Sequence, residues 1–213
     1  MHGLLFQLTQ SPLLGIIFIS SMVIALTVHE FAHAKAADML GDPTPKLHGR
    51  LTLNPLAHLD LFGSLFLLFA GFGWGKPVPF DPYNLQDPRR DAMKISLAGP
   101  MSNLFMAVVA SIIMRILLFL LPGSLSILIT ATFSIFISLN VALGVFNLIP
   151  IEPLDGFKIV GGLLPEEQAQ NWNSLRRYGM IFLILVIIPL GPGPAIADMF
   201  VNTVGGFLLR FLI

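Results

Sequence analysis

Two histidines and a glutamate within five residues form the strongest chemical signal in the sequence. His29 and His33 are four positions apart, so on an α-helix both imidazoles lie on one face, one turn apart. Two neutral imidazoles placed in this way can bind one Zn²⁺, and Glu30 is close enough to take a proton from a metal-bound water. The pattern predicts hydrolytic zinc chemistry. The alternative interpretation is a membrane helix whose interfacial end carries polar residues that reach toward headgroups.

The element that must position these residues is strongly apolar. Residues 12–28 contain no charged side chain and are long enough to cross most of a bilayer core. The whole chain of 213 residues is 55% hydrophobic and only 11% charged, which predicts a polytopic, all-α membrane protein. Its formal net charge of +0 provides no basic surface for nucleic acid. Because the chain has no cysteine, a zinc ion would have to be held by histidines and carboxylates.

The remaining apolar stretches predict about four to six transmembrane helices in one domain, 1–213, with its core at about 12–165. Short apolar runs, Gly/Pro turns and one irregular stretch (44–60) separate the longer ones. The apolar run from Leu61 to Phe72 is too short for a comfortable crossing, and Gly73 to Phe80 breaks regular structure. This segment predicts a re-entrant or β-hairpin element between the first two long helices. The expected helices span about Pro12–Met39, Ala92–Leu121 and Ser126–Leu148, with Tyr178–Leu190 and Ala195–Ile213 unsettled and a polar loop at Leu163–Arg177.

The distribution of lysine and arginine predicts where the polar residues meet. Positive charge follows the first helix, precedes the second and follows the third, so these ends are expected to be cytoplasmic. Helix ends at one depth can build a site from facing side chains. For Asp155 the alternative is a turn residue before glycine. The residues brought to a similar depth are His29, His33, Asn103, Asn147 and Asp155.

Three separate motifs together resemble the site-2 proteases, a family of intramembrane zinc metalloproteases. They are His29-Glu30-Phe31-Ala32-His33, Gly99-Pro100-Met101-Ser102-Asn103, and Asn147-Leu148-Ile149-Pro150 continuing to Leu154-Asp155-Gly156. Gly49–Asp60 and Gly73–Pro79 resemble the compact prokaryotic members more loosely. The resemblance covers about Leu26 to Pro165, with no room for a PDZ or CBS domain.

The resemblance implies one zinc per chain, bound by His29, His33 and Asp155, with Glu30 as catalytic base. It implies that Asn103 and Asn147 hold the substrate or stabilise the oxyanion. The implied activity is hydrolysis of peptide bonds in or near transmembrane segments of other membrane proteins. The implied setting is a prokaryotic cell membrane, with the active site toward the cytoplasm. The expected partners are a transmembrane substrate and the lipid bilayer, with a homo-oligomer left open.

Two other functions are compatible with parts of the sequence. Intramembrane His, Glu, Asp and Asn also line ion or proton pathways, so a transporter is the main alternative, although no repeat relates two halves of the chain. A zinc-binding but inactive adaptor is the other, and the intact Glu30 argues against it. His58 and Asp60 are candidate supporting residues. A structural role is favoured for His48 and His58, and a water-facing position is favoured for Glu152.

Overall fold

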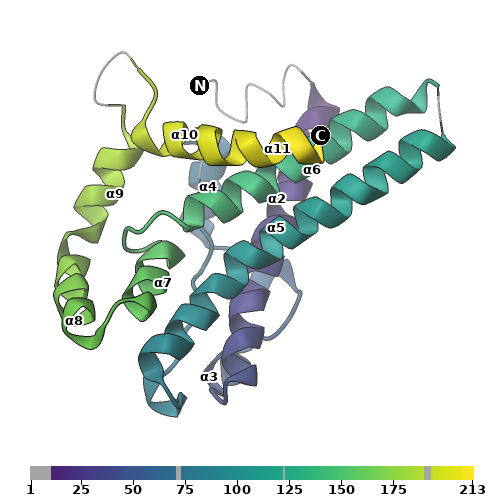
Figure 1. Ribbon diagram of the computed structural model, residues 1–213. Coiled ribbons are helices and arrows are strands. Elements are labelled where there is room, and N and C mark those ends of the chain that lie inside the picture. The colour runs from purple at the N-terminus through teal and green to yellow at the C-terminus, as the bar shows by residue number, and fades with distance from the viewer. Residues whose placement is uncertain (1–10, 71–72, 122, 190–192) are drawn as a thin grey trace.

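The computed structural model describes residues 11–70, 73–121, 123–189 and 193–213. Within these ranges the regular structure is helical, and β-pairing is limited to one antiparallel bridge between Leu59 and Gly75. Three long helices cross in the middle of the molecule, and the shorter helices lie around them (Figure 1). The all-α class expected from the sequence is therefore confirmed.

Helix α2 (Pro12–Met39) has the bounds that the sequence predicts. Proline fits its first position because that residue has no intrahelical N–H bond to lose. Its end is set by Gly41, which adopts a φ of 98°, a left-handed conformation that glycine adopts without steric cost. Asp42 then accepts hydrogen bonds from Asp81 N–H and the Asn84 amide, which ties the segment at 81–84 to this end of α2.

Helices α5 (Pro88–Leu120) and α6 (Leu125–Asn147) complete the central group, and each packs against α2 and against the other. Asp87 caps α5 by accepting a hydrogen bond from Arg90 N–H, so α5 begins four residues earlier than expected. Among the described residues, α2, α5 and α6 are the helices long and apolar enough to cross a membrane.

The segment between α2 and α5 was expected to hold a re-entrant or β-hairpin element at 61–80, and its described residues form no β-hairpin. Its apolar run forms helix α4 (Leu61–Ala70), capped by Asp60, which accepts from Gly63 N–H. The chain then returns so that Lys76 N–H donates to His58 C=O, and 71–72 lie outside the described residues. The other short helices of this segment are α3 (Thr44–Leu47), η1 (Pro55–Ala57) and η2 (Pro82–Asn84).

The C-terminal third is more helical than expected. The predicted polar loop at 163–177 is wrong: Trp172, on a helix in this region, stacks on Phe157 with ring centroids 5.1 Å apart and donates to its carbonyl. The last helical stretch lies across α6 and α5 (Figure 1). The elements are α7 (Asp155–Leu163), α8 (Glu166–Ser174), η3 (Leu175–Tyr178), α9 (Gly179–Ile187), α10 (Ile196–Phe200), the π-helical turn η4 (Val201–Gly205) and α11 (Gly206–Leu212).

Candidate metal centre

The structure brings together the three residues that were expected to bind zinc. His29 and His33 lie one turn apart on α2, and Asp155 begins α7, directly after the proline-rich turn that follows α6. His29 Nε2 lies 3.0 Å from His33 Nε2, and Asp155 Oδ2 lies 3.1 Å and 3.2 Å from these two nitrogens. In a tetrahedral zinc site with bonds of about 2.1 Å, ligand atoms are about 3.4 Å apart, so the three atoms are spaced as such a site requires.

The outer nitrogens of both imidazoles are already used. His29 Nδ1–H donates to Asn103 Oδ1 at 2.6 Å, and His33 Nδ1–H donates to Ile95 C=O at 2.7 Å. In the neutral imidazoles, each Nε2 therefore presents a lone pair toward Asp155 Oδ2. Three acceptor atoms that converge without a proton between them need a cation, and an outer hydrogen bond of this kind is usual for metal-binding histidines.

Helix α5 leaves space beside these atoms because residue 99 has no side chain. A Cβ added to Gly99 would lie 2.4 Å from His33 Nε2 and 2.6 Å from His29 Nε2. The space beside Gly99 and the three ligand atoms both suit a zinc ion. Among the described residues, His29, His33 and Asp155 form a group that could hold a metal ion. We call these three residues the metal group.

The carboxylate of Asp155 is held in its charged form by its neighbours. Burial alone would raise the pKa of Asp155, but the positive charge of His33 and the hydrogen bonds from His29 and His33, present when the imidazoles carry the extra proton, act more strongly in the opposite direction. The pKa is therefore well below its usual value. A carboxylate that is ionised at neutral pH is the form that binds a metal ion.

Glu30 is buried next to the first ligand, with 8% of its surface exposed. No hydrogen bond or ion pair to its carboxylate is found among the residues that the structure describes. Its carboxylate is thus uncommitted, as a base that must accept and release a proton requires.

The two asparagines occupy different surroundings from those expected. Asn103 is fully buried, and besides accepting from His29 it donates to Ala25 C=O and to Asn140 Oδ1, at 3.1 Å and 3.0 Å. Its amide is therefore committed to holding His29, which does not support the expected contact with substrate. Asn147 is partly buried and donates to Leu143 C=O within its own helix.

Sequence reasoning missed Asn140, which is fully buried and supports Asn103. It is a polar residue inside an apolar span, seven positions before Asn147 and so on nearly the same face of α6. That signal was present in the sequence, because polar residues in a membrane helix are functional candidates by default.

The other candidate residues lie outside the metal group. His58 is fully buried, and its Nε2–H donates to Thr52 C=O, while Asp60 caps α4. His48 is exposed. Glu152 is partly buried and pairs with Arg176 at 3.1 Å, so it does not simply face water.

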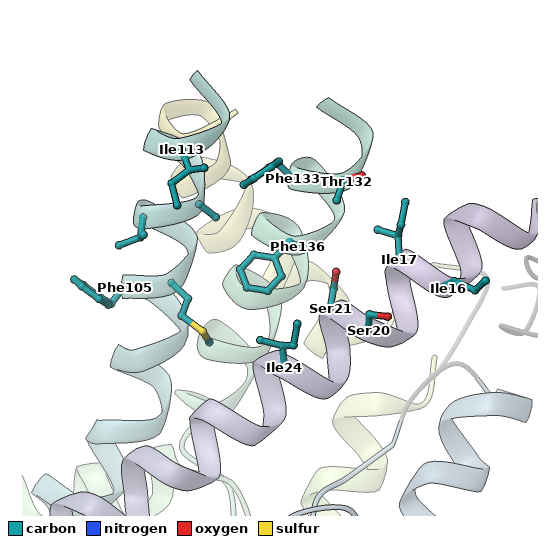
Figure 2. Close-up of a pocket in the computed structure, with 13 residues that line it drawn as sticks. Ile16, Ile17, Ser20, Ser21, Ile24, Phe105, Ile113, Thr132, Phe133 and Phe136 are labelled. Carbon is teal, nitrogen blue, oxygen red and sulfur yellow. The ribbon is translucent and has the colours of Figure 1, made fainter. Parts of the chain in front are cut away.

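An apolar hollow in the structure is separate from this centre. It has a volume of about 520 Å³ and lies between α2, α5 and α6, toward the first half of α2 (Figure 2). Its lining is almost wholly apolar and includes Ile17, Ile24, Phe105 and Phe136. It holds no constellation of acids, bases or metal ligands.

Comparison with known proteins agrees with this geometry. The model of "Peptidase family M50" matches residues 121–187. A Bacillus subtilis (strain 168) protein named as the zinc metalloprotease YwhC is 40% identical over 175 residues, which are 80% of this chain and 80% of that protein.

Two mycobacterial proteins named as the zinc metalloprotease Rip2 are also similar. The protein of Mycobacterium tuberculosis (strain H37Rv) is 27% identical over 81% of this chain and 67% of its own length. The protein of Mycolicibacterium smegmatis is 30% identical over 83% of this chain and 68% of its own length. No solved structure matches the chain.

Proposed function

Because this chain belongs to peptidase family M50, the zinc metalloproteases of the site-2 protease type, we propose that it cleaves other proteins within the membrane. Its substrates would be membrane proteins, cut in or near a transmembrane segment. The observation that supports this most strongly is the position of the metal group. His29, His33 and Asp155 converge at one end of α2, a helix apolar enough to span a bilayer.

His29, His33 and Asp155 would hold the zinc ion. Zinc bound there would lower the pKa of a water molecule toward about 7 and would polarise a carbonyl oxygen. Asn103 and Ile95 C=O fix the two imidazole rings from outside and keep Nε2 as the binding atom. Asn140 in turn holds Asn103, so residues of α2, α5 and α6 all support the ligand set.

Glu30 is the proposed general base. Its carboxylate takes a proton as water attacks the peptide carbonyl and then returns it to the leaving amine. The burial of Glu30 restricts the water around it, and its freedom from hydrogen bonds leaves its oxygens available for both transfers. Asn147, which uses only one amide hydrogen within α6, stays the candidate for holding the substrate or stabilising the oxyanion.

The return segment at 75–80 offers a place for an unwound substrate. Pro77 and Pro79 force the residues before them into extended backbone, and the N–H groups of Val78 and Phe80 have no partner among the described residues. Gly75 lies against Leu26, and Phe80 packs against the cluster that contains Ala37.

These contacts align the segment with the catalytic end of α2. From Gly75 to Phe80 the chain takes five extended steps, which cover about 16 Å. This length equals the rise of α2 over the roughly eleven residues from Leu26 to Ala37. The segment would therefore run beside the turns that carry Glu30 and His33. A substrate strand added to its free edge would lie next to the base, and helix-weakening residues in the substrate would favour cleavage.

We place the site toward the cytoplasm of a prokaryotic multi-pass membrane protein, because positive residues gather at that end of the long helices. The three apolar helices would form its membrane core. The proposed count of four to six crossings also requires α9 and the helix at 196–212. The proposed re-entrant element is α4 with the return segment at 73–80. Formation of a homo-oligomer is left open. The names of the relatives do not favour a transporter.

The test combines metal content and cleavage in detergent-purified protein. The wild type should hold about one zinc per chain, and His33→Ala and Asp155→Ala should lose it. Glu152→Gln is the control, because it removes a nearby charge outside the metal group. A synthetic single-span peptide with a glycine pair near its cytoplasmic end should be cut by the wild type and not by Glu30→Gln.

Two results would contradict the proposal. Cleavage by Glu30→Gln at the wild-type rate would remove Glu30 as the base. The transporter alternative would be favoured if the wild-type protein, purified without chelator, holds no zinc and cuts no peptide.

A further inference from the structure

Arg50 is a buried cation that the proposed mechanism does not yet use. Only 4% of its surface is exposed, although arginine is almost never this buried unless it is paired. Its Nη2–H donates to Lys76 C=O, whereas its buried Nε–H has no partner among the described residues. A buried guanidinium with an unused donor is expensive to keep, so a functional reason is needed.

Glu30 is an acidic residue that is likewise buried, one helical turn after Leu26, against which Gly75 lies. Burial lowers the pKa of the Arg50 guanidinium, and the negative charge of Glu30 opposes this effect. Glu30 is also buried and forms no hydrogen bond or ion pair with a described residue.

Arg50 also holds the residue at which this edge begins, before its unpaired part at 78–80. Lys76 N–H donates to His58 C=O at 2.7 Å, and Lys76 C=O accepts from Arg50, so both backbone groups of this residue are held. In extended backbone, residues two apart present their N–H and C=O groups to the same edge. Val78 and Phe80 therefore continue the edge that Lys76 begins, with Arg50 at its first position.

We propose that Arg50 is a positioning residue that holds this edge beside Glu30, so that an extended substrate meets the base in register. The inference rests on the proposed function. Arg50 acts through the backbone of Lys76, and it is not one of the candidate metal ligands. Its loss should therefore weaken productive substrate binding while the zinc site stays intact.

The experiment measures KM, kcat, zinc content and unfolding temperature for wild type, Arg50→Gln and Arg50→Lys with the single-span peptide. Arg50→Gln should raise KM at least tenfold with one zinc retained. Arg50→Lys should fall between it and the wild type, because lysine keeps the charge but not the planar fork. The matched control is Arg115→Gln, since Arg115 Nη2–H also donates to a backbone carbonyl, that of Phe211, at 2.6 Å near the other end of α5.

The outcomes separate the claims. A KM for Arg50→Gln within twofold of the wild type, or the same change in Arg115→Gln, overturns the inference alone. If Arg50→Gln does not fold, Arg50→Lys decides: a KM raised at least threefold with zinc retained supports the inference, and an unchanged KM overturns it. A wild type that does not cut the peptide refutes the proposed function, and this inference with it.

Discussion

At the residue scale, the metal group depends on hydrogen bonds that come from three helices. His29 on α2 is held by Asn103 on α5, and Asn103 is held by Asn140 on α6. Because Asn103 is fully buried and also donates to Ala25 C=O, its amide has one orientation that satisfies all its partners. The orientation of the His29 imidazole therefore depends on how the three long helices pack.

This chain of contacts predicts graded effects on zinc affinity. Asn103→Ala should weaken zinc binding by roughly 10–100-fold, because the outer partner of His29 is lost. Asn140→Ala should have a smaller effect in the same direction, since it acts only through Asn103. Competition with a chelator measures both. Asn147→Ala is the control, because its amide bonds only within α6 and should leave affinity unchanged.

The candidate metal ligands could be predicted from the sequence, but the hydrogen bonds that hold them could not. The spacing of His29 and His33 fixes a shared helix face, whatever the rest of the fold does. The orientation of Asn103 could not be predicted in this way, because it depends on how α5 packs against α2 and α6. Equal affinity in the Asn103→Ala and wild-type proteins would show that this support is not needed.

At the element scale, α5 must approach α2 closely enough for its backbone to lie against the metal ligands. Gly99→Ala should therefore abolish stoichiometric zinc binding, because the new Cβ would lie 2.4 Å from His33 Nε2. The helix itself should persist, since alanine is a better helix former than glycine. Zinc content and circular dichroism together check this. The control is Gly206→Ala, where an added Cβ meets nothing within 4 Å; full zinc content in Gly99→Ala would contradict the packing.

Elements differed in how far the sequence could predict them. The bounds of α2 were correct because a proline start and a Gly-Asp-Pro end frame a long apolar run. The apolar run at 61–70 is short, and periodicity alone does not separate a helix from a buried strand at that length. Helix α8 was missed because its polar composition looked like a loop. Its Trp172, however, packs on Phe157, and that contact stabilises it.

At the scale of the whole molecule, the fold gathers its chemistry at one end of the long helices. His29 and His33 lie in the last three turns of α2, Asn103 lies in the first half of α5, and Asp155 follows α6. The hollow of about 520 Å³, toward the other end of α2, is apolar (Figure 2). Charge bias and span length could predict this grouping because they constrain every helix at once, whereas local details of packing depend on particular contacts.

The sidedness of the molecule follows from the same asymmetry and can be tested because the chain has no cysteine. Leu47→Cys lies in α3, on an 80% exposed residue at the proposed cytoplasmic end, and Ser124→Cys lies in the turn between α5 and α6. In intact cells a membrane-impermeant maleimide should label the second variant and not the first. Permeabilised cells should label both, which controls for accessibility. Labelling of Leu47→Cys in intact cells would invert the topology and place the metal centre toward the outside, because α3 follows directly from the helix that carries His29 and His33.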